Sequence, residues 1–244
     1  MRVLCVIPAR YGSSRLPGKP LADIAGAPMV VRVLARAGQA TRPDAVLVAT
    51  DDARIVTAVE AAGGRAELTD PRHASGSARV AEIAARFPAD IYVNVQGDEP
   101  CLDPAAIDAV VDGLAAHPDW DLASGYHALP GPPLDDPNTV KVVCAHDGRA
   151  LYFSRCPIPY PRHGGGGCRI HLGLYAYRRD VLLSLSTLPA SPLAEAESLE
   201  QLAFLQAGLT VGMVAVAAPA GPSVDTPEDL EQVRALYSSG LFEA

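Results

Sequence analysis

The chain has 244 residues, of which 49% are hydrophobic and 20% are charged, and its formal net charge is −8 at pH 7. That length is enough for one or two domains with a buried core, and the charged fraction is too low for a disordered, charge-extended chain. The acidic balance argues against a nucleic-acid-binding surface. The longest apolar runs fall far short of the roughly 18 residues that a membrane span needs.

Cysteine usage and the first residues indicate the compartment. Five cysteines without CxxC spacing favour a reducing compartment over a disulfide framework. The apolar run Val3–Ile7 is too short for a secretory signal. We therefore expect a soluble cytoplasmic enzyme that binds neither nucleic acid nor membrane.

Strands and helices alternate through the first part of the chain. The hydrophobic pattern predicts strands at Val3–Ile7, Ala45–Ala49, Arg65–Leu68 and Asp90–Val95, and helices at Pro28–Ala37, from Asp52 to near Gly63, and at Ser77–Phe87. This alternation predicts an α/β fold with a mostly parallel sheet, right-handed crossovers and helices on both faces. Ligands bind beyond the carboxyl ends of the strands in such sheets.

The second half is less regular. It predicts strands at Leu122–His127, Val140–Cys144, Ala150–Phe153 and Gly173–Tyr177 without long helices between them, followed by helices at Pro192–Ala207 and Pro227–Tyr237. No internal repeat or interdomain linker is evident. We therefore expect a single domain over 1–244, with a small antiparallel insertion at about residues 120–190.

A basic loop follows the first strand. Pro8–Pro20 contains the cations Arg10, Arg15 and Lys19 together with two serines and two glycines. Glycine lets backbone N–H groups approach an anion, and the cations would neutralise a polyphosphate. Neither the Walker pattern nor GxGxxG is present. The pattern favours a phosphate-binding loop over a merely solvated basic one.

Two acidic segments are candidates for a metal site. Gln96–Pro100 places Asp98 and Glu99 after a buried strand, which suits Mg²⁺ bound together with phosphate oxygens. An aspartate capping a helix that starts near Pro104 would explain the pattern equally well. Near the C-terminus, Asp225 begins a segment typical of a plain helix start, and that structural interpretation is favoured on the pattern alone.

Several motifs together carry a family resemblance. In chain order they are PARYGSSRLPGKPLADIAGAPMV, VATDD, RHASGSAR, VNVQGDEP, ALYFSR, HLGLYAYRR, SPLAEAESLEQL and SVDTPEDLEQVRA. In this order the motifs resemble those of the 3-deoxy-D-manno-octulosonate (Kdo) cytidylyltransferases, and the likeness runs from about residue 2 to about residue 237. The first loop is shared with other sugar-nucleotide transferases, whereas the set of later motifs is far more specific.

The resemblance implies a Rossmann-like nucleotidyltransferase fold, usually a homodimer, that requires Mg²⁺ and joins CTP to Kdo, giving CMP-Kdo, a lipopolysaccharide precursor, and pyrophosphate. It implies catalytic roles for Arg10, Lys19 and Asp98, and metal binding by Asp98 and Asp225. The matching CTP-binding positions are Arg10, Ser13, Arg15, Lys19, His73, Ser75 and Arg79. The matching sugar-acid positions are Gln96, Arg155, Arg162, His171, Tyr175, Glu200 and Gln201. The remaining acids near Glu200, Glu195 and Glu197, are expected on a solvated helix face.

The chain departs from the family pattern at three places. Ala78 stands where the family has an acid, the segment after FSR runs into Gly164–Gly167 and Cys168, and Ala194 and Ala196 replace larger residues. The last two lie on the sugar side. Two alternatives therefore stay open: a cytidylyltransferase for 8-amino-Kdo, another sugar acid or a phosphonate, and a nucleotide-binding homologue without catalysis.

Overall fold

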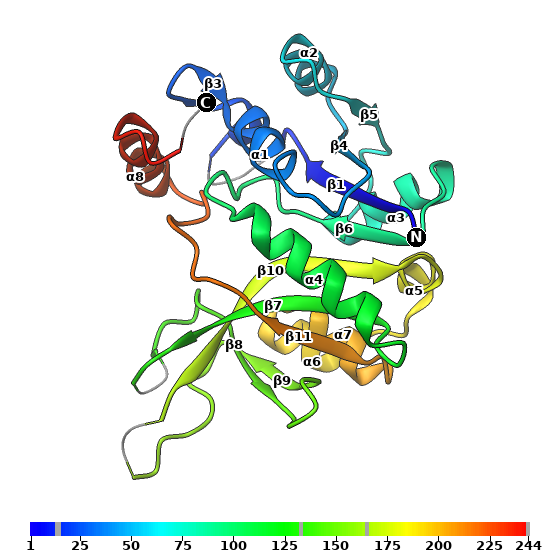
Figure 1. Ribbon diagram of the computed structural model, residues 1–244, viewed down its shortest axis with the longest axis vertical. Coiled ribbons are helices and arrows are strands. Elements are labelled where there is room, and N and C mark those ends of the chain that lie inside the picture. The colour runs from blue at the N-terminus through cyan, green and yellow to red at the C-terminus, as the bar shows by residue number, and fades with distance from the viewer. Residues whose placement is uncertain (13–15, 132–133, 164–165, 243–244) are drawn as a thin grey trace. The chain divides into compact units, whose positions relative to one another are not determined.

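The computed structural model describes residues 1–12, 16–131, 134–163 and 166–242. They form two compact units, the first comprising Met1–Asp108 with Pro219–Ala244 and the second Ala109–Ala218 (Figure 1). The expectation of a single domain with an insertion at about 120–190 stays a prediction. No helix of the described residues is long and apolar enough to cross a membrane.

The first unit contains a parallel sheet. Its strands are β1 (Val3–Ala9), β4 (Ala45–Thr50), β5 (Ala66–Leu68) and β6 (Ile91–Asn94), in the order β6-β1-β4-β5. All three pairings are parallel. The continuous apolar run of β1 is buried almost throughout, as expected of a strand covered on both faces.

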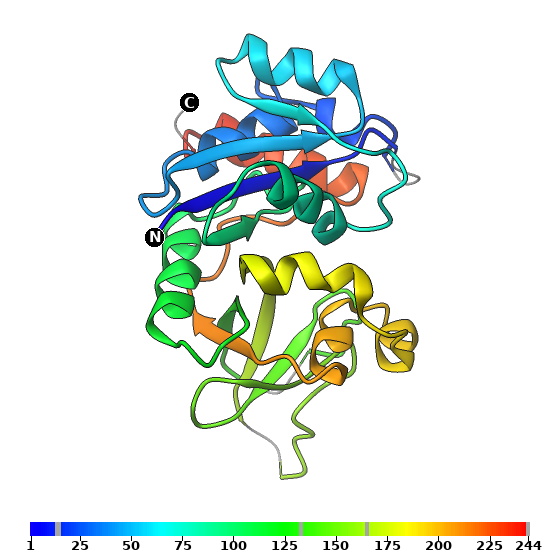
Figure 2. The ribbon, with the colours of Figure 1, turned by 90° about the vertical axis from the view of Figure 1, so that its right-hand side faces the viewer.

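Helices cover both faces of this sheet. They are α1 (Met29–Ala37), α2 (Ala53–Ala61) and α3 (Gly76–Arg86). α1 and α2 connect strands that follow one another from β1 through β4 to β5, whereas α3 leads back across the sheet from β5 to β6. Because the crossovers are right-handed, α1 and α2 lie on one face and α3 lies on the other (Figure 2). The predicted mostly parallel α/β arrangement is confirmed.

The C-terminal segment returns to the first unit. The short helix η1 (Lys19–Leu21) precedes the hairpin of β2 (Asp23–Ile24) and β3 (Ala27–Pro28), and α8 (Pro227–Ser238) lies beside this hairpin (Figure 1). Apolar side chains of the two segments form one buried cluster that includes Ile24, Val224 and Val233. The phenol of Tyr237 donates a hydrogen bond to the carbonyl of Pro100 at 2.6 Å. Residues distant in sequence are thereby fixed beside the first loop.

The second unit is mainly antiparallel. The helix α4 (Pro104–Ala116) leads into it, and its strands are β7 (Leu122–Leu129), β8 (Lys141–Cys144), β9 (Ala150–Ser154), β10 (Cys168–Arg178) and β11 (Val211–Ala215). β10 pairs antiparallel with β7 and β8, β8 pairs antiparallel with β9, and β11 joins β7 in parallel. The predicted antiparallel strands are confirmed, and β11 is an addition to them.

One predicted helix is divided in two. Residues 192–207 form α6 (Pro192–Glu197) and α7 (Gln201–Gln206) and not one helix, so that prediction is wrong. Ser198 adopts a left-handed conformation with φ of 51°, which ends α6 because the right-handed helix cannot continue through it. The next residue, Leu199, is buried. The helix α5 (Arg179–Ser184) and the short helix η2 (Leu185–Thr187) precede this segment.

Candidate functional site

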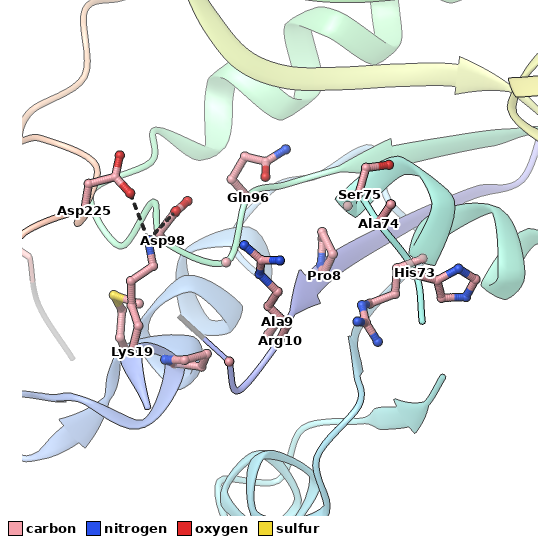
Figure 3. A pocket seen from close by; sticks show the side chains of 16 residues that line it. Pro8, Ala9, Arg10, Lys19, His73, Ala74, Ser75, Gln96, Asp98 and Asp225 are labelled. Atoms are coloured by element: carbon pink, nitrogen blue, oxygen red, sulfur yellow. Dashed lines mark hydrogen bonds and ion pairs between the residues drawn. The ribbon is translucent and has the colours of Figure 1, made fainter. Parts of the chain in front are cut away.

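A cavity of about 320 Å³ lies at the carboxyl ends of β1 and β6 (Figure 3). Its walls come from five segments of the first unit: the end of β1 with the loop after it, the first residue of α1, the start of α3, the loop after β6, and the segment before α8. Cavities of this size accommodate small ligands. The predicted site residues that line it are Arg10, Lys19, His73, Ser75, Arg79, Gln96, Asp98 and Asp225. Ser13 and Arg15, also predicted to bind CTP, lie outside the described residues.

Lys19 joins the two predicted metal ligands. Its ammonium donates to Asp98 Oδ2 at 2.7 Å, to Asp225 Oδ1 at 3.2 Å and to the carbonyl of Val224 at 2.7 Å. Figure 3 shows the ammonium between the two carboxylates. An ammonium has three N–H donors, so all three are used. Two acidic groups from distant parts of the sequence, one mid-chain and one near the C-terminus, thus converge on a single cation.

The acidic side of the cavity carries more negative charge than Lys19 neutralises. The pKa of Glu99 is raised to about 8, first by burial and then by the negative charges of Asp98 and Asp225, while Lys19 partly opposes the shift. Such a surplus, presented by carboxylate oxygens, fits a hard divalent cation such as Mg²⁺. No cluster of three or more metal-binding side chains occurs in the part of the chain that the structure describes. A metal here would need further ligands from phosphate and water.

Neither Asp98 nor Asp225 caps a helix. α8 is capped by Thr226, whose side chain accepts from the backbone N–H of Asp229, and the Asp229 carboxylate accepts from the N–H groups of Asp225 and Thr226. The Asp103 carboxylate accepts from the N–H of Ala105 at the start of α4. The capping that the sequence pattern allowed for Asp98 and Asp225 is therefore performed by their neighbours.

Two glycines allow these loops to meet. A Cβ on Gly97 would lie 2.7 Å from the carbonyl oxygen of Pro8, so only glycine fits where the loops after β1 and β6 touch. Gly18 has φ of 68° and precedes η1, whose first residue is Lys19. A left-handed turn at that point suits glycine, and it places the lysine at the cavity.

The start of α3 is held by its own polar contacts. Ser75 caps the helix by accepting from the N–H of Ala78 at 3.2 Å. An acid at position 78 would complete a capping box, so the departure at Ala78 removes a helix-start contact. His73 Nε2 lies 2.7 Å from Glu82 Oε2. Burial raises the pKa of Glu82, but hydrogen bonds from the backbone of Asp70 and from His73 outweigh it and the net pKa is lowered.

Arg79 is a buried member of the cavity wall. Its side chain is 3% exposed and forms an ion pair with Asp51, with Nη2 at 3.2 Å from Oδ2. Its other amino group donates to Thr69 Oγ1. Arg10, in contrast, is exposed and extends from the end of β1 into the cavity. The two arginines thus differ: Arg79 is fixed by protein contacts, and Arg10 is available to an anion.

The second unit contains most predicted sugar-acid residues. Ser124 Oγ donates to the carbonyl of Leu172 or Leu174 and lies 2.9 Å from His171 Nε2. Because the hydroxyl has one proton, which a carbonyl takes, we assign the Nε2–H tautomer to His171, with Nδ1 as an acceptor. Burial lowers the pKa of His171 to about 3. His171 is therefore a neutral ring at neutral pH.

Tyr175 connects His171 with α7. The rings of His171 and Tyr175 are 5.5 Å apart, and a bulge in the pairing of β10 with β7 separates the two residues. The pKa of Tyr175 is raised by burial and by the nearby charge of Glu200. Gln201 is buried at the start of α7. The structure thus brings His171, Tyr175 and Glu200 together.

Arg155 and Arg162 differ from this group. The Arg155 guanidinium donates to the carbonyls of Glu197 at 2.7 Å, Pro137 at 2.6 Å and Ser198 at 3.3 Å. Three of its N–H groups are therefore used by main-chain carbonyls, which leaves fewer N–H groups for a sugar carboxylate. Arg162 lies exposed in the loop before β10.

Sequence reasoning missed the residues that hold Arg155. Glu197 was expected on a solvated face, and this is wrong: its carboxylate accepts from Ser154 Oγ at 2.7 Å and from the N–H of Arg155 at 2.8 Å. Lys141 is fully buried and donates to the carbonyls of Asp136, Thr139 and Arg155. No sequence periodicity distinguishes Glu197 and Lys141 from surface charges, since their burial depends on how the chain folds around them: the partners of Glu197 lie 42 and 43 positions away, and one carbonyl that Lys141 contacts lies 14 positions away.

Comparison with known protein families gives a full-length match. Residues 4–211 match the model of the family described as cytidylyltransferase. A 3-deoxy-manno-octulosonate cytidylyltransferase of Escherichia coli is 49% identical over 243 residues, which covers 99% of this chain and 98% of that protein. The protein of the same name from Solibacter usitatus is 46% identical, with 99% of this chain and 97% of that protein covered.

Solved structures agree with this match. A structure described as CMP:2-keto-3-deoxy-manno-octonic acid synthetase complexed with CTP has a TM-score of 0.93 and 47% identity, covering 98% of this chain and 100% of that one. A cytidylyltransferase from Leptospira borgpetersenii has a TM-score of 0.67 at 16% identity, which indicates a shared fold alone.

Proposed function

The chain belongs to the cytidylyltransferase family and, within it, to the 3-deoxy-manno-octulosonate cytidylyltransferases, and from this premise we propose that it joins CTP to Kdo. The Kdo anomeric hydroxyl attacks the α-phosphorus of CTP, the bond to the β-phosphate breaks, and CMP-Kdo, pyrophosphate and one proton are the products. The enzyme is a nucleotidyltransferase. The observation that carries the proposal is the cavity in which Lys19, Asp98 and Asp225 meet beside Arg10.

The cations of the cavity suit a triphosphate. Arg10 is exposed and lines the cavity, so its guanidinium is free to form paired hydrogen bonds with phosphate oxygens. Lys19 supplies a second positive charge next to the acidic cluster. Because the transferred and leaving groups are anionic, neutralising and positioning them provides most of the catalysis in phosphoryl-type transfer.

Asp98 and Asp225 would hold Mg²⁺ in this proposal. Their carboxylates already share one cation, the ammonium of Lys19. When bound, the metal would neutralise charge on the phosphates of CTP. With its two acidic partners neutralised by the metal, the Lys19 ammonium would be able to contact a phosphate of CTP.

For the sugar acid we propose Gln96, Arg155, Arg162, His171, Tyr175, Glu200 and Gln201, as the family pattern implies. The neutral His171 ring would accept a hydrogen bond at Nδ1 from a hydroxyl of the sugar. The Glu200 carboxylate would accept a hydrogen bond from another sugar hydroxyl. Since Arg155 is engaged with three carbonyls, the exposed Arg162 is the better partner for the sugar carboxylate.

Pyrophosphate release tests the proposal. The enzyme is incubated with CTP and Mg²⁺ and with Kdo, 8-amino-Kdo, other sugar acids or a phosphonate, each in turn. Release with Kdo above the other acids supports the proposal. Release with a different acid and not with Kdo would assign a different acceptor. CTP binding without release for any acid would identify a nucleotide-binding homologue without catalysis.

We also propose a homodimer that acts in the cytoplasm and supplies CMP-Kdo for lipopolysaccharide synthesis. The support is the full-length similarity to the family, because the family resemblance implies a homodimer. Sedimentation of the purified protein would test the dimer.

A further inference from the structure

We propose that Asp51 is a positioning residue for the nucleotide, holding the loop after β1 against the start of α3. Asp51 directly follows β4 and is not among the residues that line the cavity. The proposal rests on the proposed function, because it assumes that CTP occupies this cavity. It adds a residue to which the family resemblance gives no role.

The Asp51 carboxylate joins two walls of the cavity. Oδ1 accepts from the backbone N–H of Tyr11 at 3.1 Å, and Oδ2 accepts from Arg79 Nη2 at 3.2 Å. The side chain of Asp51 is 15% exposed and that of Arg79 is 3% exposed. Hydrogen bonds to a charged group with so little solvent access are stronger than neutral ones.

Arg79 links the carboxylate back to the sheet. Its second amino group donates to Thr69 Oγ1, and this hydroxyl donates to the carbonyl of Thr50 at 3.0 Å. Thr50 is the last residue of β4 and precedes Asp51. The contacts therefore close a ring of Asp51, Arg79, Thr69 and Thr50, which fixes the carboxylate at the end of a buried strand.

Tyr11 lies between two residues that line the cavity, Arg10 and Gly12. Fixing its N–H fixes the backbone from which the exposed Arg10 side chain extends. The Tyr11 ring is also held, since the Arg54 guanidinium lies 3.5 Å from the ring centroid. On the opposite wall, Arg79 belongs to the helix whose first residues line the cavity. Loss of Asp51 would thus let the two walls move independently, and a ligand that contacts both would bind more weakly.

Asp44 offers a matched control at the other end of the same strand. Its Oδ2 accepts from the backbone N–H of Val3 at 2.7 Å, and neither residue lines the cavity. Asp44 thus joins the start of β4 to the start of β1, as Asp51 joins the end of β4 to the loop after β1. Replacing either aspartate by alanine removes one carboxylate-to-backbone contact.

The test measures CTP affinity by titration calorimetry, together with the KM for CTP and the KM for the acceptor acid. We expect Asp51→Ala to raise the Kd and KM for CTP about tenfold while leaving the KM for the acid within twofold. Asp51→Asn keeps an acceptor for the N–H of Tyr11 but loses the charge opposite Arg79. Its Kd for CTP should therefore lie between those of the unchanged protein and Asp51→Ala. Asp44→Ala should bind CTP as the unchanged protein does.

A merely structural Asp51 would give other results. Equal Kd values for Asp51→Ala, Asp44→Ala and the unchanged protein would overturn the proposal, as would an equal rise in both KM values. If Asp51→Ala does not fold, the Asp51→Asn value decides, and an unchanged Kd in that variant overturns the proposal. Absence of CTP binding by the unchanged protein would contradict the proposed function itself.

Discussion

The ammonium of Lys19 lies 2.7 Å from Oδ2 of Asp98, although the two residues are 79 positions apart in the sequence. The lysine is 15% exposed and the aspartate 29%, so solvent screens this pair only in part. The contact joins the predicted phosphate-binding loop to the predicted metal-binding loop. It is the local relationship on which the first two predictions depend.

Asp98→Asn should reduce kcat by about 10³-fold, because the variant loses the negative charge that is needed to hold a divalent cation. The fold should be kept, since the asparagine remains able to contact Lys19 through its carbonyl. Asp103→Asn is the control: it changes a nearby carboxylate that accepts from the N–H of Ala105, and asparagine caps helices as well as aspartate does. A variant Asp98→Asn with near-normal turnover would remove this residue from the mechanism.

Lys19→Met should lower the free energy of unfolding by about 2 kcal/mol, because it leaves partly buried carboxylates without their cation. Adding Mg²⁺ should then raise the melting temperature of this variant more than that of the unchanged protein, since the metal restores the lost neutralisation. Thermal unfolding with and without Mg²⁺ measures both effects. An identical Mg²⁺ response in the two proteins would contradict a metal site at Asp98 and Asp225.

His171→Gln should flatten the dependence of stability on acid pH. The pKa of His171 is about 3 in the folded protein, against an ordinary value of 6.5, because the ring is buried. Between these values the unfolded chain binds a proton that the folded protein does not. The free energy of unfolding therefore falls as pH decreases through this window, by up to about 1.4 kcal/mol per pH unit for this one group.

Denaturant unfolding at several pH values between 3 and 7 compares the two proteins. The variant should be less stable at neutral pH, having lost its contact with Ser124, yet its stability should decrease less steeply towards acid. If stability falls equally steeply with pH in the two proteins, the folded protein protonates His171 as readily as the unfolded chain does.

Gly212→Ala should destabilise the second unit by about 2 kcal/mol or more. A Cβ at Gly212 would lie 1.8 Å from a ring atom of Trp120, and the ring is buried and stacked on His117, so it has little room to move. Trp120 is the one tryptophan of the chain, so its fluorescence should shift to longer wavelength as the ring becomes exposed. Gly125→Ala is the control, because its Cβ would meet neighbours at ordinary distances of 3.4 Å or more. Comparable loss in both variants would contradict the explanation.

Much of the first unit could be predicted because its signals are local. The apolar run of β1 and the helix start at Asp52 are readable in short windows of sequence, and the structure has them. The end of α6 could not be predicted in the same way. The pattern of residues 192–207 is continuous, and only the left-handed backbone at Ser198 and the burial of Leu199 divide it.

The candidate site shows the same division. Arg10, Lys19, Asp98 and Asp225 were predicted because charged side chains follow strands or precede a helix in a family pattern, and they line one cavity. Asp51 directly precedes Asp52, which caps α2, and the motifs gave Asp51 no role of its own. Its partners, the backbone of Tyr11 and the side chain of Arg79, lie 40 and 28 positions away, and short windows of sequence do not contain such pairs.

The first unit is discontinuous, since residues 1–108 and 219–244 belong to it and 109–218 do not. Because synthesis on the ribosome is vectorial, a nascent chain that ends before residue 219 already contains Arg10, Lys19 and Asp98. It still lacks Asp225 and α8. Assembly of this acidic cluster must therefore await translation past residue 225, and a product that terminates earlier lacks the second carboxylate that contacts Lys19.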